Sequence, residues 1–433
     1  MDPHRNPGRA FALAVALFSV LSPQAGDAQS PDPGPVVLRA AWMLDVSSGA
    51  MLADAVVVVE GKTITAVNPA RLPAGAEIVD LGDVTLLPGL IDLHTHLAYD
   101  IGGDWVTRPV TETAADVAFR AARNARTTLM AGFTTVRDVG SSGFVDVALG
   151  KAVEAGFVPG PRVIPSGYAL GITGGHCDVT GFAPGILEMG PEQGVADGPD
   201  EVLKAVRYQI KHGAKSIKIC ATAGVLSFEE SVGAQQFTEE EMRVIVEEAA
   251  RHGMGVAAHA HGTVGINAAV RAGVASIEHG SLLDGESIRL MKEHGTFLVP
   301  TTYLVDAIDL EALPPGIREK AEYILPRARE NLRMAIRGGV KIGFGTDAAV
   351  YPHGDNAREF AVLVSLGMSP LEAIRSATIH ATELLGVSDR GVIEAGRLAD
   401  IIAVPGNPLE DVSVTERVGF VMMGGKVFKR MGQ

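Results

Sequence analysis

Short apolar runs alternate with amphipathic segments through the middle of the chain. Eight of the runs have the length and composition of buried strands: residues 89–96, 134–139, 162–166, 216–221, 255–261, 276–279, 296–300 and 341–346. Six segments between them have helical periodicity: residues 114–131, 199–212, 238–252, 264–272, 284–294 and 317–338. Buried strands alternating with helices predict an α/β fold, and eight repeats favour a TIM-like (β/α)8 barrel over a doubly wound open sheet.

Both ends of the chain carry strand patterns without helices between them. These patterns cover residues 36–44, 55–60 and 63–68 near the start, and residues 400–404, 418–423 and 426–429 near the end. Gly61-Lys62 and Gly424-Gly425 have the composition of tight hairpin turns. We therefore expect a small β-sandwich domain built from residues 29–87 and 391–433, with the barrel formed by residues 88–390.

The first 28 residues have the layout of a secretory signal peptide. Arg5 and Arg9 precede an apolar run over residues 10–21, and small residues lead to a cleavage position after Ala28. An uncleaved membrane anchor is the alternative, but the run is short for a permanent membrane helix. No later stretch of the sequence is long and apolar enough to be transmembrane. The sequence thus predicts a periplasmic or secreted protein without stable membrane insertion after cleavage of residues 1–28.

Charge and cysteine content narrow the picture further. The formal net charge is −14, which argues against nucleic-acid binding because that binding needs a basic surface. Only Cys177 and Cys220 are present, too few for a disulfide framework. After export the two could form a disulfide or remain free thiols.

Side chains of the metal-ligand type occur at the ends of predicted strands. They are His94, His96, His259, His261, His279 and Asp347. The carboxyl ends of barrel strands form the active-site face, and residues two apart on a strand point the same way. Imidazole and carboxylate are the usual ligands of zinc and similar ions. The sequence therefore predicts a metal site on this face.

Lys218 lies within the apolar strand at residues 216–221. A lysine in that setting is costly unless its charge is neutralised or used, whereas Lys215 at the strand's start can reach solvent. One interpretation is a core lysine paired with an acid. The other is a lysine carboxylated by carbon dioxide, which would bridge two metals.

Several motifs resemble those of metal-dependent amidohydrolases, and nearly all of the chain after residue 28 fits them. The motifs are LPGLIDLHTH at 87–96, GTD at 345–347 and GRLADI at 396–401. Within this superfamily, IKICATAGVLS at 217–227 and HAHG at 259–262 resemble one branch. That branch contains imidazolonepropionase-like proteins, Xaa-Pro and Xaa-Arg/Lys dipeptidases, and ochratoxinase.

The resemblance implies a site with two divalent metal ions, for which the histidine-rich ligands suit zinc. By the family pattern, His94, His96 and Asp347 would bind the more buried ion, while His259 and His279 would bind the other. Lys218, carboxylated at its Nζ, would bridge them. Spacing alone cannot choose between His259 and His261. The family pattern favours His259 as the ligand and leaves His261 as a substrate contact.

The implied reaction is hydrolysis of an amide bond in a small molecule, such as an N-acyl amino acid, a dipeptide or an ochratoxin-like amide. Two metals would lower the pKa of a shared water, and Asp347 would act as general acid and base. Further candidate substrate contacts are His176, Tyr168 and Tyr303, although such tyrosines more often serve packing. His353 is a weaker candidate. Relatives form homo-oligomers, often octamers, which is an expectation by analogy.

Two other functions are compatible with the same fold. An imidazolonepropionase-like cyclic amide hydrolase, a deaminase or a lactonase would be an enzyme alternative. The deaminase and imidazolone-type relatives commonly use one metal and lack the bridging lysine, so Lys218 argues against them. A non-catalytic binding scaffold is the alternative outside enzymes. Such proteins tend to have lost ligands, whereas all six expected positions are filled here.

Overall fold

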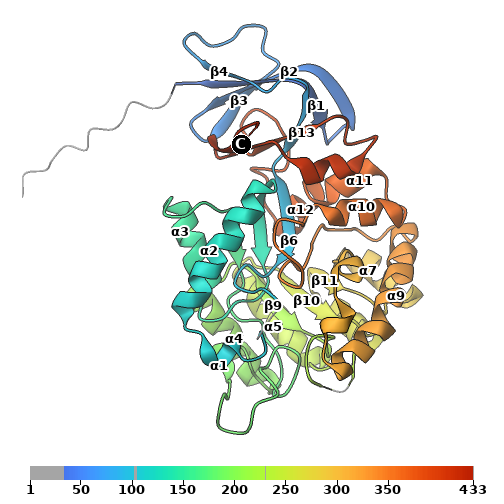
Figure 1. Ribbon diagram of the computed structural model, residues 1–433. Helices are drawn as coiled ribbons and strands as arrows, with labels where there is room; N and C mark the ends of the chain where they lie inside the picture. Colours follow the sequence, from blue (N-terminus) through green and yellow to red (C-terminus); the bar gives the residue numbers. More distant parts are fainter. Residues whose placement is uncertain (1–33, 102–104, 230, 433) are drawn as a thin grey trace, which may run out of the picture. The chain divides into compact units, whose positions relative to one another are not determined.

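The computed structural model describes residues 34–101, 105–229 and 231–432 (Figure 1). The predicted signal peptide at residues 1–28 lies outside the described residues, so its cleavage and the export of the protein stay predictions. The described residues belong to one compact unit, Gly34–Gln433. None of the helices in this part of the chain is long and apolar enough to cross a membrane.

One sheet joins the two ends of the described chain. It has eight strands in the order β15-β14-β13-β5-β1-β2-β3, with β4 paired to β1. Its strands are β1 (Val36–Asp45), β2 (Ala50–Glu60), β3 (Thr63–Val67), β4 (Glu77–Asp80), β5 (Val84–Pro88), β13 (Ile401–Pro405), β14 (Phe420–Met423) and β15 (Lys426–Lys429). The ends meet where β13 pairs antiparallel with β5, Ile402 opposite Leu87. Strands β4 and β5 were not among the predicted strands. The domain boundaries stay a prediction.

Two parallel sheets form the interior of the middle region. The first has the order β6-β7-β8, with β6 (Leu90–Thr95), β7 (Phe133–Asp138) and β8 (Arg162–Pro165). The second has the order β12-β11-β10-β9, with β9 (Ile217–Cys220), β10 (Val256–Ala260), β11 (Ser276–His279) and β12 (Phe297–Val299). All these strand pairs are parallel, which confirms the predicted α/β class.

Backbone hydrogen bonds continue from one parallel sheet to the other at both edges. Leu170, after β8, donates to the carbonyl of Lys218 at 2.8 Å. At the other edge, Leu298 of β12 donates to Lys341 O at 2.9 Å, and Leu93 of β6 donates to Phe344 O at 2.8 Å. The segment at residues 341–348 thus lies between β12 and β6.

The prediction of a regular strand at residues 341–346 was wrong. This segment makes only isolated bridges, at Ile342 and, just beyond it, at Ala348. Its N–H groups bond in different directions, with Gly343 donating to Leu298 and Phe344 donating to Ser376. In an interior strand successive N–H groups bond the two neighbouring strands in turn, but Phe344 bonds Ser376, the last residue of α11, in place of β6, so the segment is extended without being regular.

Helices cover these sheets (Figure 1). The longer ones are α2 (Ala114–Met130), α3 (Val145–Glu154), α4 (Gly198–His212), α5 (Glu239–Arg251), α6 (Thr263–Ala272), α7 (Gly285–His294) and α9 (Pro315–Arg337). Shorter ones are α1 (Arg108–Thr111), α8 (Leu304–Ala307), α10 (Arg358–Ser365), α11 (Pro370–Ser376) and α12 (Ile379–Leu385). The six predicted helices are confirmed within a few residues, whereas α3 and α10 to α12 were not predicted.

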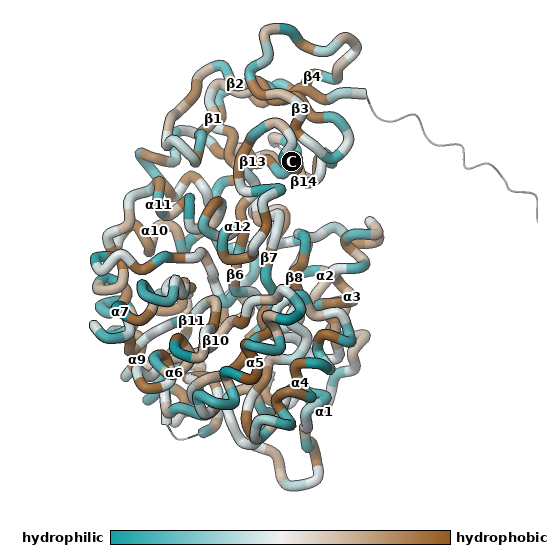
Figure 2. Tube along the Cα trace, turned by 180° about the vertical axis from the view of Figure 1, so that it is seen from behind, coloured by the Kyte–Doolittle hydropathy of each residue, from teal (hydrophilic) through white to brown (hydrophobic). Residues whose placement is uncertain are grey.

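Local sequence explains where the helices begin and which side they bury. Thr238 and Glu241 cap the start of α5 reciprocally, and Thr113 and Asp116 do the same for α2. Hydrophobic and hydrophilic positions alternate along the helices in Figure 2, as expected for elements with one buried face. The apolar faces and the strands form one large core, with smaller clusters within the terminal sheet, beneath α2 and α3, and beside β6.

Candidate metal centre

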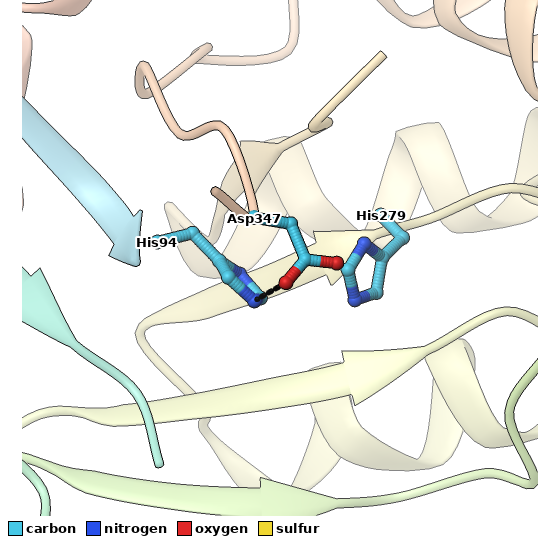
Figure 3. Close-up of side chains that lie close together, drawn as sticks. All are labelled: His94, His279 and Asp347. Carbon is cyan, nitrogen blue, oxygen red and sulfur yellow. Dashed lines mark ion pairs between the residues drawn. The ribbon is translucent and has the colours of Figure 1, made fainter. Parts of the chain in front are cut away.

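Three side chains of the metal-ligand type, from three parts of the chain, lie close together: His94, His279 and Asp347 (Figure 3). His94 comes from β6, His279 ends β11, and Asp347 follows the extended segment beside β12. One ligand atom from each of these three residues lies within 4.8 Å of the others. His94 Nε2 is 3.5 Å from Asp347 Oδ1, and His96 Nε2 is 3.4 Å from the same oxygen. These distances leave room for an ion bound between the side chains.

Three of the histidines predicted as metal ligands are held by a hydrogen bond at Nδ1. The partner of His94 Nδ1 is Glu278 Oε2 at 2.7 Å, and that of His96 Nδ1 is the Gly140 carbonyl at 3.1 Å. His279 Nδ1 lies 2.8 Å from Thr301 Oγ1. With Nδ1 engaged in this way, Nε2 remains for a ligand, as in many metal-binding histidines.

His259 and Lys218 extend this cluster. His259 lies on β10, with its ring centroid 4.7 Å from that of His279. Its Nε2 is buried and has no hydrogen-bond partner among the described residues. Lys218 lies on the neighbouring β9, where burial lowers its pKa to about 8. A lower pKa increases the share of neutral amine, the form that reacts with carbon dioxide.

The protonation states suit a cation. Burial lowers the pKa of His96 to about 4, and it lowers the pKa values of His259 and His279 well below the usual value. These rings are therefore neutral near pH 7. Burial would raise the pKa of Asp347, but His94 and His96 outweigh this effect and lower it, so the carboxylate is ionised. Neutral imidazoles, a carboxylate and an orphaned buried nitrogen fit a divalent metal ion.

Backbone strain also occurs at this site. His279, Thr301 and Asp347 have φ angles of 68°, 50° and 57°, a region that residues with a side chain rarely adopt. Such conformations cost on the order of 1–3 kcal/mol each and persist where the surroundings impose them, often at functional sites. Here the strained residues are two ligand candidates and the hydrogen-bond partner of one of them.

Two predicted substrate contacts border the cluster. The ring of His176, in the loop after β8, lies 4.2 Å from that of His259, and its Nδ1 lies 2.7 Å from Ser227 Oγ. His261 follows β10, with its ring 5.1 Å from that of His279 and its Nδ1 2.8 Å from Ser281 Oγ. Burial lowers the pKa of His176 to about 4 and that of His261 to about 3. Both histidines are therefore neutral near pH 7.

The remaining candidates are occupied by neighbouring protein groups. The Tyr168 hydroxyl accepts a hydrogen bond from the Gly143 N–H at 2.8 Å. The Tyr303 hydroxyl accepts one from Arg358 at 3.0 Å. His353 Nε2 lies 3.1 Å from the Tyr99 carbonyl. A substrate role for Tyr168, Tyr303 and His353 stays a prediction.

The two cysteines form a disulfide with their Cα atoms 5.9 Å apart. Cys177 is adjacent to His176 in the loop after β8, and Cys220 ends β9, two residues beyond Lys218. The bond ties the loop that carries His176 to the strand that carries Lys218.

Sequence reasoning missed two buried charges below the site. Arg137 lies on β7 and Glu278 on β11, and the Arg137 guanidinium bonds the Glu278 carboxylate at 2.8 Å. Burial would raise the pKa of Glu278, but Arg137 and the hydrogen bond to His94 outweigh this and hold it at about 2. Both residues carry a charge within an apolar strand, as Lys218 does, and that is the sequence signal that marks them.

A parallel α/β core with imidazoles, a carboxylate and a lysine at its strand ends defines a class of protein. This is the arrangement of hydrolytic enzymes that use metal ions to activate water and polarise a carbonyl. Residues 85–428 match the model of the amidohydrolase family. The chain belongs to this family and is a hydrolase, and the family is typically metal-dependent.

Similar proteins narrow the branch of this family. Ochratoxinase from Aspergillus niger is 37% identical over 432 residues, which cover 93% of this chain and 88% of the relative. Imidazolonepropionase from Deinococcus radiodurans is 26% identical over 401 residues, covering 89% of this chain and 93% of the relative. A solved Xaa-Pro dipeptidase with methionine bound in its active site is 39% identical, with a TM-score of 0.87, covering 91% of this chain and all of that one. The branch indicated by the sequence motifs is confirmed.

Proposed function

We propose that the protein is a hydrolase with two divalent metal ions that cleaves an amide bond in N-acyl amino acids or dipeptides. One observation carries the proposal. Histidines anchored through Nδ1 present Nε2 toward a shared aspartate, beside a buried histidine nitrogen without a partner. Buried polar atoms usually have a hydrogen-bond partner, and a metal ion would supply one for this nitrogen.

The six ligands would be divided between two ions. His94, His96 and Asp347 would hold one ion, and His259 and His279 the other. Lys218, once carboxylated at Nζ, would supply a bridging carboxylate. The choice of His259 over His261 follows the family pattern, and the buried His259 Nε2, which has no partner among the described residues, supports it. Zinc suits this set of nitrogen and oxygen donors.

Bound ions would supply the activation of water and the polarisation of the scissile carbonyl. Asp347 is ionised and buried, so it can accept a proton from the attacking water and deliver it to the leaving nitrogen. His176 and His261 are neutral near pH 7 and border the cluster. They can donate hydrogen bonds to a substrate carbonyl or carboxylate without adding charge to the site.

The names of two relatives support the substrate class. A Xaa-Pro dipeptidase cleaves a dipeptide amide bond, and the solved structure of that name carries an amino acid in its active site. Ochratoxinase is similar along 93% of this chain. An ochratoxin-like amide is therefore included among the proposed substrates. Lys218 continues to argue against the imidazolone-type and deaminase alternatives, whereas a lactone substrate would be compatible with the same site.

The proposal includes the architecture around the site. The hydrogen bonds that join the two parallel sheets at both edges support closure into a (β/α)8 barrel. Residues 88–390 would form this barrel, and residues 29–87 with 391–433 the β-sandwich domain. We further propose a periplasmic or secreted homo-oligomer, octameric as expected from the resemblance, after removal of residues 1–28.

The test is a substrate screen on zinc-loaded protein, using N-acyl amino acids and dipeptides with varied C-terminal residues. We expect release of the C-terminal amino acid, which should stop on chelation and return on addition of zinc. The matched control is Asp347→Asn, which keeps the size of the side chain and removes its basicity. Hydrolysis of lactones or cyclic amides alone would favour the alternative, and full amidase activity in Asp347→Asn would contradict the proposed role of Asp347.

A further inference from the structure

Glu278 occupies the position directly below His94. The residue is fully buried on β11, and its Oε2 lies 2.7 Å from His94 Nδ1. Its other oxygen, Oε1, accepts a hydrogen bond from Arg137 Nη2 at 2.8 Å and also contacts the Ser276 hydroxyl. Both carboxylate oxygens therefore have partners inside the protein.

Arg137 is itself fixed in place. Its Nε donates to the Leu93 carbonyl at 2.6 Å, and its Nη1 donates to Ser276 Oγ at 3.1 Å. The network thus connects β6, β7 and β11, the strands beneath the metal centre. With one oxygen held by the guanidinium, the Glu278 carboxylate cannot turn away from His94.

This geometry determines which nitrogen of His94 carries the proton. An ionised carboxylate can only accept hydrogen bonds, so the ring must donate from Nδ1. A neutral imidazole has one proton, and Nε2 then keeps its lone pair. His94 Nε2 is the atom 3.5 Å from Asp347 Oδ1, on the side of the proposed metals.

We propose that Glu278 is a positioning residue that sets the tautomer of His94 for metal binding, with Arg137 holding Glu278 in place. This inference rests on the proposed role of His94 as a ligand. A buried ion pair that only stabilises the fold is the competing explanation. The two explanations differ in what an uncharged residue of the same shape would do.

Glu278→Gln separates them. The side-chain oxygen of the glutamine would accept the hydrogen bond from Arg137. The amide NH2 of the glutamine would then point toward His94 Nδ1. His94 would then accept at Nδ1 and carry its proton on Nε2, where no lone pair remains for a metal. We expect the affinity for one of the two zinc ions to fall about 10- to 100-fold, the usual effect of losing such a partner.

Arg137→Gln is the second variant. It removes the ion pair as Glu278→Gln does, but it leaves a carboxylate on His94 Nδ1. We expect a clearly smaller loss of zinc affinity from Arg137→Gln than from Glu278→Gln. The matched control is Glu248→Gln. Glu248 is a buried residue of α5, and its carboxylate pairs with Arg207 of α4 and Arg251 of α5. Because Glu248 contacts none of the candidate ligands, this variant should not change zinc binding.

The measurement is competition for zinc between the metal-free protein and a chromophoric chelator, with circular dichroism of each metal-free variant as the check of folding. A selective loss in Glu278→Gln supports the inference. Wild-type affinity in a folded Glu278→Gln variant would overturn it, as would an equal loss in Arg137→Gln. If the wild-type protein binds no zinc, both the inference and the proposed function are wrong. The wild-type measurement therefore separates failure of the proposed function from failure of the inference alone.

Discussion

The two sides of the site are held in different ways. On the side of His94 and Asp347, the candidate ligands lie at or just beyond the ends of β6 and the neighbouring extended segment, above the buried Arg137–Glu278 pair. On the side of His176, the candidate lies in a loop, where strand pairing cannot fix it. The contrast shows that partners on the strands themselves hold His94, whereas a residue in a loop depends on bonds from other parts of the chain.

Lys320 provides such bonds on the loop side. It is a buried residue of α9, and its Nζ donates to the carbonyls of Gly224, Ser227 and Glu229 at 3.2, 2.6 and 2.9 Å. Ser227 in turn holds His176 Nδ1. Gly224 leaves the space that the His176 ring occupies, since a Cβ there would lie 2.1 Å from the ring. The position of His176 therefore depends on the loop after β9.

The largest effect is expected on the strand side, from Lys218→Ala. Loss of the bridging group should reduce amide hydrolysis at least about 100-fold, and short carboxylic acids should restore part of it. The measurement is the hydrolysis rate with and without added acetate or propionate. Lys215→Ala, at an exposed position three residues earlier, is the control and should retain activity. An active Lys218→Ala variant would contradict the bridging role.

The next effect concerns the disulfide between the two sides. Cys177→Ser opens a covalent link across 43 residues of sequence, so the free energy of unfolding should fall by about 2–4 kcal/mol. Urea unfolding measures this loss, and wild-type protein treated with a reductant should show the same change. If the variant and the reduced wild type match the oxidised wild type in stability, the bond does not hold the loop.

A smaller effect is expected from Lys320→Met on the loop side. Without its three hydrogen bonds the loop after β9 should shift, and with it His176. A misplaced substrate contact should raise KM about 10-fold with unchanged metal content. Steady-state kinetics and metal analysis give the two readouts. Lys204→Met, at an exposed position on α4, is the control. Loss of metal in Lys320→Met would mean that the two sides are not independent.

The smallest effect is a pH dependence due to His261. Burial holds its folded-state pKa at about 3, whereas an unfolded histidine has a pKa of about 6.5. Between these values the unfolded chain binds one proton more, so the stability contribution is present above about pH 6.5 and is lost as the pH falls. His261→Gln should remove about one proton from the slope of unfolding free energy against pH in metal-free protein. An unchanged slope near pH 5 would show that His261 titrates normally in the folded state.

The difference between strands and loops also explains what the sequence could predict. His94, His96, His279 and Asp347 were identifiable because a strand period and the topology of parallel strands place their side chains together. Lys320 was not, because a lysine on an amphipathic helix usually faces solvent and nothing in the period marks it as buried. Ser227 was not, because loop geometry depends on tertiary contacts. The choice between His259 and His261 could not be made from spacing, because residues two apart on a strand point the same way.

Six residues are proposed to hold two metal ions. The direct test is a titration of metal-free protein with zinc, following both bound metal and amide hydrolysis. We predict two ions per chain at saturation, with full activity only when both are bound. Full activity with one ion or none per chain would contradict the claim.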